Sequence, residues 1–418
     1  MGKTIVEKIL SMKSGTDATA GDIVVAEFDI AMINDASGPL TREIFKKMGA
    51  RSVATPNRII AVIDHYVPCP NQKVARLQQE LYEFCSEFDI ELVAGGEGIA
   101  HQILDELGKI VPGSLIIGAD SHTITHGFLN CFSVGIGSSD MAMAMHTGSL
   151  WFKVPETIRI NLSGRLKPLV SGKDVGLHIL RLLGSDGANY KSIEFSGQGV
   201  SALSMDDRKT ICNLMAECGA KCAIMPFDDL AKEYCEINEL DASGAIEADK
   251  SCSYVNVIEI DLCSLDLLVA KPHSPTEVVE LREVLGQKVD VVVIGTCTNG
   301  RLSDFEVIGS IMSKSEASLC SETLIIPSSR KVQTGITTKG IAAELLTKGA
   351  MILPPGCGPC CGSSPGVPRD NQVVLSTANR NYVGRMGNPQ ALIYLASPAV
   401  AISAAIKGYF VDPREMNK

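Results

Sequence analysis

The sequence predicts an α/β protein whose sheets are largely parallel. Short apolar segments alternate along the chain with longer segments whose apolar residues recur at helical spacing. This alternation is typical of folds in which a helix carries the chain back to the edge where the next strand begins. A chain of 418 residues is also longer than a single hydrophobic core usually accommodates, which predicts two or three domains.

The first 160 residues show the alternation clearly. Helices are predicted over residues 3–12, Leu40–Met48, Val74–Phe88 and Met141–Leu150. Strands are predicted over Asp22–Phe28, Ile59–Ile63, Glu91–Ala94, Ser114–Ile117 and Ile158–Leu162. Polar or glycine-rich stretches between them predict the loops.

The same pattern continues through the rest of the chain. Further helices are predicted over Val175–Leu183, Met205–Glu217, Phe305–Met312 and Ile341–Lys348. Further strands are predicted over Ser192–Phe195, Val289–Ile294, Thr323–Ile326 and Met351–Leu353, with a loop over Cys222–Asp229 and a linker over Lys271–Thr276. The uncharged segment Asn388–Ile406 contains two prolines, so it predicts a buried helix rather than a membrane span.

Composition limits the partners and the compartment that we expect. The net charge of −10 and the lack of a basic stripe argue against a nucleic-acid partner. Fourteen cysteines, with no secretory leader, predict a reducing, cytoplasmic environment and no membrane partner.

Acidic and imidazole side chains follow several predicted strands. They are Asp64, His65, His101, Asp120 and His122. The histidines among them, with His126, are four of the seven in the chain. A single histidine is more often a core or surface residue, but repeated placement beside aspartates at strand ends favours a ligand crevice.

Three cysteines lie on glycine-bearing turns just past predicted strands. Cys357 and Cys360 have a C-x-x-C spacing, and Cys297 arrives from another turn. Three thiolates without an obvious fourth fit a four-iron four-sulfur (4Fe-4S) cluster with one iron open to substrate, whereas a structural zinc site usually takes four ligands. We expect Cys361 to pack, because neighbouring residues rarely both face one centre.

Two other motifs carry weaker signals. Residues 135–140 are glycine-rich but lack the full dinucleotide fingerprint, so they predict a turn before a helix. Asn379, Arg380, Asn381 and Arg385 form a donor-rich loop suited to carboxylates, against the alternative of a solvated basic loop.

Five of these segments, in this order, resemble the aconitase superfamily, specifically separate large subunits of the 3-isopropylmalate dehydratase and homoaconitase type. They are residues 118–123, 210–213, 295–301, 356–360 and 379–387. The likeness covers essentially the whole chain. It implies a three-domain body over residues 1–160, 161–275 and 276–418, with the last domain carrying the cluster cysteines Cys297, Cys357 and Cys360.

The resemblance also implies roles for the polar residues. The family removes and re-adds water on a 2-hydroxy di- or tricarboxylic acid, with the open iron acting on the hydroxyl. Asp64 and His65 look like the pair that protonates that hydroxyl. The companions implied in the site are His101, Asp120, His122, Asn213 and Glu217, and those implied in substrate binding are Asn379, Arg380 and Arg385.

Two departures and one absence qualify the likeness. The family commonly has a histidine where this chain reads residues 362–366, and a threonine at the position of Ala378. The swivelling fourth domain, which supplies the serine base in single-chain relatives, is not found before Lys418. We therefore expect a small swivel-domain subunit as partner, in a heterodimer or heterotetramer.

The expected function is a hydro-lyase, with 3-isopropylmalate dehydratase of leucine biosynthesis first. Homoaconitase and a dimethylmalate or citramalate dehydratase are the alternatives within the family. From other classes, an iron-responsive RNA-binding protein is disfavoured by the acidic charge. An electron carrier would normally need a fourth thiolate.

Overall fold

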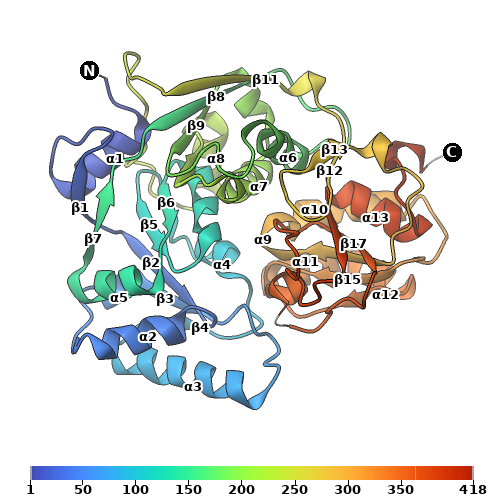
Figure 1. Ribbon diagram of the computed structural model, residues 1–418, viewed down its shortest axis with the longest axis horizontal. Helices are drawn as coiled ribbons and strands as arrows, with labels where there is room; N and C mark the ends of the chain where they lie inside the picture. Colours follow the sequence, from blue (N-terminus) through green and yellow to red (C-terminus); the bar gives the residue numbers. More distant parts are fainter. Residues whose placement is uncertain (1, 363, 417–418) are drawn as a thin grey trace.

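The computed structural model describes residues 2–362 and 364–416, and they form three larger sheets and one two-stranded sheet, with helices around them (Figure 1). In that view the blue-to-teal sheet lies at the left, the green sheet at the top and the orange-to-red sheet at the right. Within these residues, no helix combines the length and the apolar character needed to cross a membrane.

The first sheet has five parallel strands in the order β4-β3-β2-β5-β6. Its strands are β2 (Ile30–Asn34), β3 (Ile59–Val62), β4 (Glu91–Val93), β5 (Leu115–Gly118) and β6 (Phe132–Gly135). Its helices are α1 (Ile5–Ser14), α2 (Gly38–Lys47), α3 (Gln72–Glu87), α4 (Ala100–Glu106) and α5 (Ser138–Thr147). A separate antiparallel pair joins β1 (Ile23–Glu27) to β7 (Ser149–Lys153).

The second sheet has four parallel strands in the order β10-β9-β8-β11. They are β8 (Thr157–Ser163), β9 (Ser192–Ser196), β10 (Cys222–Ile224) and β11 (Asn256–Asp261). The helices of this part are α6 (Gly172–Leu183), α7 (Met205–Leu214) and α8 (Asp229–Ile237).

The third sheet has seven strands in the order β13-β12-β18-β17-β14-β15-β16, of which β12 and β13 run antiparallel to their neighbours. The strands are β12 (Leu268–Ala270), β13 (Val278–Glu280), β14 (Val291–Gly295), β15 (Glu322–Ile326), β16 (Met351–Ile352), β17 (Val373–Ser376) and β18 (Leu392–Leu395). The helices are α9 (Thr296–Asn299), α10 (Leu302–Met312), α11 (Arg330–Thr338), α12 (Ile341–Thr347) and α13 (Pro398–Lys407).

The α/β class with largely parallel sheets is confirmed, and several local predictions were wrong. Residues 222–229 were expected to be a loop but begin with β10. Residues 271–276 were expected to be a linker but form the turn between β12 and β13, so the third sheet begins before them. The segment 388–406 holds the strand β18 as well as the buried helix α13. The strands β2, β6, β7, β11, β12, β13 and β17 and the helices α4, α8, α9 and α11 were not predicted.

The first sheet is buried on both faces, as expected of a parallel sheet covered by helices. Alternate residues of β3 belong to different cores, because successive side chains point to opposite faces. Ile59 and Ala61 pack with α1, α2, α3 and α5, whereas Ile60 and Val62 join the core that continues into the other two sheets. That continuous core holds the three sheets in one arrangement.

The carboxyl edge of the first sheet faces the corresponding edge of the third. The amide N–H of Cys357 donates to Asp64 O at 2.8 Å, and that of Ile99 donates to Ser328 O at 2.8 Å. The loops that follow strands of both sheets therefore meet, and a ligand crevice at this edge is typical of α/β folds.

Candidate active site between two sheets

A buried aspartate fixes the turn that carries Asp64 and His65. Asp35 follows β2, and its Oδ1 accepts the backbone N–H groups of Asp64 at 3.1 Å and of His65 at 2.9 Å. Burial, reinforced by the nearby charge of Asp64, raises the pKa of Asp35. The turn is thus held from the neighbouring strand, which keeps both side chains at the sheet edge.

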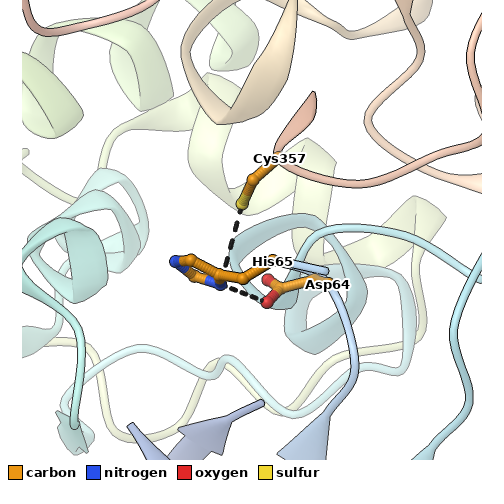
Figure 2. Close-up of side chains that lie close together, drawn as sticks. All are labelled: Asp64, His65 and Cys357. Atoms are coloured by element: carbon orange, nitrogen blue, oxygen red, sulfur yellow. Dashed lines mark hydrogen bonds and ion pairs between the residues drawn. The ribbon is translucent and has the colours of Figure 1, made fainter. Parts of the chain in front are cut away.

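Asp64 and His65 form a close acid–base pair beside a cysteine (Figure 2). His65 Nδ1 lies 2.6 Å from Asp64 Oδ1 and 3.8 Å from Cys357 Sγ. The other carboxylate oxygen of Asp64 accepts the N–H of Ala100 at 2.8 Å, at the start of α4. Burial lowers the pKa of His65, but negative charge on Cys357 and Asp64 outweighs it and the pKa is raised well above its usual value.

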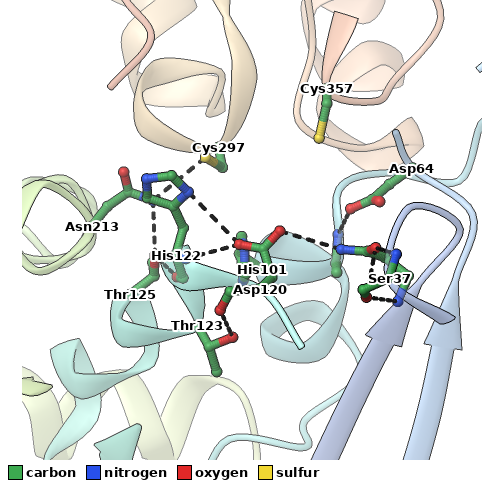
Figure 3. A network of polar contacts seen from close by, with 12 residues as sticks. Ser37, Asp64, His101, Asp120, His122, Thr123, Thr125, Asn213, Cys297 and Cys357 are labelled. Atoms are coloured by element: carbon green, nitrogen blue, oxygen red, sulfur yellow. Dashed lines mark hydrogen bonds and ion pairs between the residues drawn. The ribbon is translucent and has the colours of Figure 1, made fainter. Parts of the chain in front are cut away.

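Asp120 lies at the centre of three imidazoles (Figure 3). Its Oδ1 accepts the backbone N–H of His122 at 2.8 Å and lies 3.1 Å from His101 Nε2. Its Oδ2 lies 3.6 Å from His65 Nε2. Burial raises the pKa of Asp120, but the hydrogen bond and charge of His101 and the two other imidazoles prevail, so the pKa is well below normal.

Glu217 connects this network to the third sheet. It lies in a 3₁₀ turn after α7, 4 % exposed, and its Oε1 is 2.9 Å from His122 Nε2. Arg380 Nε donates to both of its oxygens at 2.8 and 2.9 Å. Burial raises the pKa of Glu217, yet His122 and Arg380 together lower it below normal. Glu217 is therefore an ionised carboxylate that orients both partners.

Cys297 sits on a turn that needs glycine. Gly295 ends β14 with φ +129°, and a Cβ there would lie 1.9 Å from Ile326 O. Two amides, Asn213 Nδ2 and Asn379 Nδ2, each lie 3.4 Å from Cys297 Sγ as donors. Burial, followed by negative charge on Cys360, raises the pKa of the Cys297 thiol to about 11.

Cys357 and Cys360 come from the 3₁₀ turn after β16, where Cys357 contacts His65 and Cys360 contacts Asn379. Cys360 is 6 % exposed, and Arg385 Nη2 lies 3.7 Å from its sulfur. Asn379 contacts both Cys360 and Cys297, with its Oδ1 3.8 Å from Cys360 Sγ. Cys297 and Cys360 thus share Asn379 as a neighbour, and Arg385 lies beside Cys360, whereas Cys357 contacts His65. Amide and guanidinium donors suit thiolate sulfurs bound to iron.

A fully buried lysine supports the loop that carries Asn379 and Arg380. Lys173, in the first turn of α6, donates from Nζ to Thr377 O at 2.9 Å and to Ala378 O at 2.5 Å. Burial lowers the pKa of this ammonium to about 7. The lysine ties the second sheet's first helix to the end of β17.

The structure therefore brings the sequence-predicted residues into one region. Asn213 and Asn379 are linked to each other, with Asn379 Nδ2 donating to Asn213 Oδ1 at 3.0 Å. Arg385 contacts Cys360, whereas Arg380 is bound to Glu217. Ser364, at the first departure from the family pattern, donates from Oγ to His65 O at 2.7 Å, and Ser363 lies outside the described residues.

Several contributors were missed at the sequence level. They are Asn34, Asp35, Thr125, Lys173 and Tyr382. Asn34 and Asp35 could have been found, because they follow a strand just as Asp64 does, but that strand was not predicted. Nothing in the local sequence marks Lys173, since its partners are backbone carbonyls more than 200 residues away.

The chain is similar to known proteins over nearly its whole length. The chain matches the family model described as aconitase family (aconitate hydratase) over residues 7–288 and 282–408. It is 43 % identical over 415 residues to "3-isopropylmalate dehydratase large subunit 1" of Methanopyrus kandleri, covering 99 % of each chain. It is 44 % identical over 417 residues to the protein of the same name from Thermotoga maritima, again covering 99 % of each.

A solved structure shares the fold at low identity. The holo form of aconitase X from Thermococcus kodakaraensis aligns with a TM-score of 0.55 and 12 % identity, over 99 % of this chain and 95 % of that one. At this identity the likeness concerns the fold alone.

Proposed function

Because the chain belongs to the aconitase family, we propose that it is the large subunit of a hydro-lyase that dehydrates and rehydrates a 2-hydroxy di- or tricarboxylic acid. The first candidate is 3-isopropylmalate, an intermediate of leucine biosynthesis, because the full-length relatives are named for its dehydratase. The observation that carries the proposal is the Asp120 network, which places three imidazoles beside the cysteine turns.

The proposed cofactor is a 4Fe-4S cluster held by Cys297, Cys357 and Cys360. The amide and guanidinium donors around the sulfurs support it, because hydrogen bonds to sulfur stabilise and tune such clusters. When bound, the cluster would supply an open iron that acts as a Lewis acid on the substrate hydroxyl.

The proposed general acid is His65. Asp64 at 2.6 Å favours the protonated imidazole and fixes its orientation, so the ring can donate to a leaving hydroxyl. Asp120 lies 3.6 Å from the other nitrogen of that ring and 3.1 Å from His101 Nε2, so its ionised carboxylate links the two rings along one proton path. His122 and Glu217 complete the network on the side of the second sheet.

Substrate carboxylates are assigned to the donor-rich loop. Arg380 is oriented by two contacts to Glu217, and a planar guanidinium recognises carboxylates with fixed geometry. Arg385, Asn213 and Asn379 line the same region through their contacts with the cysteines.

The domains and the partner complete the proposal. We place three domains over residues 1–160, 161–275 and 276–418. Because β8 belongs to the second sheet and β12 to the third, each boundary would lie a few residues closer to the N-terminus. The relatives' names as large subunits imply a small subunit, which we propose supplies the base for the carbon-bound proton.

The direct test is substrate turnover by the reconstituted enzyme. The chain is loaded anaerobically with iron and sulfide, the small subunit is added, and alkene absorbance is followed with isopropylmalate, homocitrate, citramalate and dimethylmalate in parallel. Turnover of isopropylmalate is expected. A stable cluster with no turnover on any of the four acids would refute the hydro-lyase assignment.

The cluster assignment has a matched pair of variants. Cys297→Ser is expected to lose bound iron, visible absorbance and turnover, because one of three thiolate ligands is removed. Cys361→Ser is expected to keep all three, since Cys361 is assigned to packing. Iron and sulfide content of both purified variants is the measurement, and equal iron in the two would contradict the ligand assignment.

A further inference from the structure

His126 is a buried histidine directly behind the proposed site. It lies in the 3₁₀ segment 121–129, is 0 % exposed, and neither ring nitrogen has a hydrogen-bond partner among the described residues. His101 Nδ1 is buried without a partner in the same way, although its Nε2 faces Asp120. A buried polar group left unpaired typically costs about 1–3 kcal/mol, so these nitrogens call for an explanation.

The two rings are neighbours. Their centroids are 5.7 Å apart and their planes are inclined by 57°. That separation, without a direct hydrogen bond, is compatible with one ordered water bonded to a nitrogen of each ring. The unpaired atoms of His101 and His126 would then satisfy each other through that water.

A polar cluster adjoins the two elements that carry the pair, because Lys209 Nζ lies 4.8 Å from the ring centroid of Phe128, two residues after His126. Asp105, one helical turn after His101 on α4, is bonded to Lys209 Nζ at 2.7 Å and to Tyr234 OH at 2.8 Å. These three residues line a cavity of about 230 Å³ that also includes the exposed Asn238, so the cavity reaches solvent. The cavity thus adjoins α4 and the segment 121–129, the two elements that carry His101 and His126.

The electrostatics keep His126 neutral. Burial, then the neighbouring His101 and the charge of Lys209, hold its pKa well below the usual value. A neutral imidazole has one N–H donor and one acceptor nitrogen, which is the composition that a proton relay requires.

We propose that His126 is a positioning residue that relays protons between the solvent-facing Asp105–Lys209–Tyr234 cavity and His101, through ordered water. The role rests on the proposed hydration reaction, in which the Asp120 network must exchange protons with solvent. It extends the site by a residue that touches neither substrate nor the cysteines.

The relay moves one proton and accumulates none. One ring nitrogen of His126 accepts a proton from the outer water while the other releases its own to the bridging water. The bridging water passes a proton to His101 Nδ1, and His101 Nε2 releases one through the Asp120 carboxylate, which stays ionised, to His65 Nε2. The outer water is reprotonated from solvent, and the reverse sequence discharges the network.

The test compares three variants in the reconstituted holoenzyme. His126→Phe keeps an aromatic ring without nitrogens, His126→Gln keeps a polar group that can hold water, and His178→Phe is the control at a half-buried histidine outside the site. We expect His126→Phe to lower kcat by about tenfold to a hundredfold, the usual cost of losing a supporting residue, with KM within about twofold. The solvent deuterium effect on kcat should rise, His126→Gln should retain more activity, and the control should match wild type.

Each result decides the proposal. An unchanged kcat and an unchanged isotope effect in His126→Phe would overturn the relay. A fall in both KM and kcat that also appears in the His178→Phe control would overturn it as well. If His126→Phe fails to fold, a high-resolution crystal structure of the wild-type holoenzyme decides: an ordered water bonded to both rings supports the relay, and a dry contact overturns it. Wild-type enzyme inactive on every acid would refute the proposed function instead, and the crystal structure would still settle the water.

Discussion

Asp174 shows at the scale of one residue how burial makes stability depend on pH. It is 0 % exposed in the first turn of α6, and its carboxylate accepts N–H groups from Leu268 and Ser171, each at 2.9 Å. Burial outweighs these bonds and raises its pKa from 3.8 to about 6.

The folded chain therefore binds more protons than the unfolded chain between about pH 4 and pH 6. Stability must fall as pH rises through that window, and the loss is complete above the folded pKa. Relative to Asp174→Asn, which does not titrate, wild type is expected to lose about 1 kcal/mol between pH 5 and pH 7. Thermal melting of both proteins across this range measures it, and parallel curves would show that the carboxyl is ionised throughout.

Residue-level prediction from the sequence was most direct for side chains that follow a strand. Asp64, Asp120 and Cys297 were predicted as site residues because each lies just past a predicted strand, and the structure places each of them after a strand. Lys173 and the pairing state of His126 could not be predicted, because their surroundings come from distant segments. Arg380 was assigned to substrate, but the sequence gives no hint that Glu217 holds it.

At the scale of elements, the 3₁₀ segment 121–129 docks on β10 through a glycine. A Cβ at Gly127 would lie 1.7 Å from Ala223 O, and Gly127 O accepts the N–H of Met225 at 2.9 Å. This close approach holds His122 and His126, which lie on the same segment, against the second sheet.

Gly127→Ala is expected to destabilise the protein by about 3 kcal/mol or more, because the backbone must move apart to admit the methyl group. The matched control is Gly137→Ala, where the new Cβ would meet nothing closer than Asp140 Oδ2 at 3.9 Å. Thermal melting of both variants is the measurement. Equal melting temperatures would mean that the segment shifts freely on β10.

Long elements were easier to predict than short ones. The helix α3 spans 16 residues and shows a clear helical period, whereas β10 has three residues and α4 has seven. Short runs give too few repeats to separate a strand from a loop, and their stability comes from tertiary pairing. β6 was missed for the same reason, although it pairs with all four residues of β5.

At the scale of the whole molecule, we propose that the chain is one subunit of an enzyme that also needs the small subunit. Without the small subunit, the loaded chain is expected to turn over substrate at least about a hundredfold more slowly, because a missing general base typically costs that much. The measurement is the initial rate with and without the partner at equal cluster content. Full activity of the chain alone would show that it supplies its own base.

The sequence pattern did not predict how the three larger sheets are placed relative to one another. The pattern of strands and helices predicts what each sheet contains, but the way two sheet edges face each other depends on contacts such as that from Cys357 N to Asp64 O. Only the family resemblance connected the two regions in advance.

The facing edges also determine when the site can exist. His65 and Cys357 are 292 positions apart in the chain, and Arg385 comes later still. During synthesis the first sheet can form once β6 at residues 132–135 has emerged, long before the cysteine turns are made. The proposed cluster could therefore be loaded only after translation has passed Cys360, in the last third of the chain.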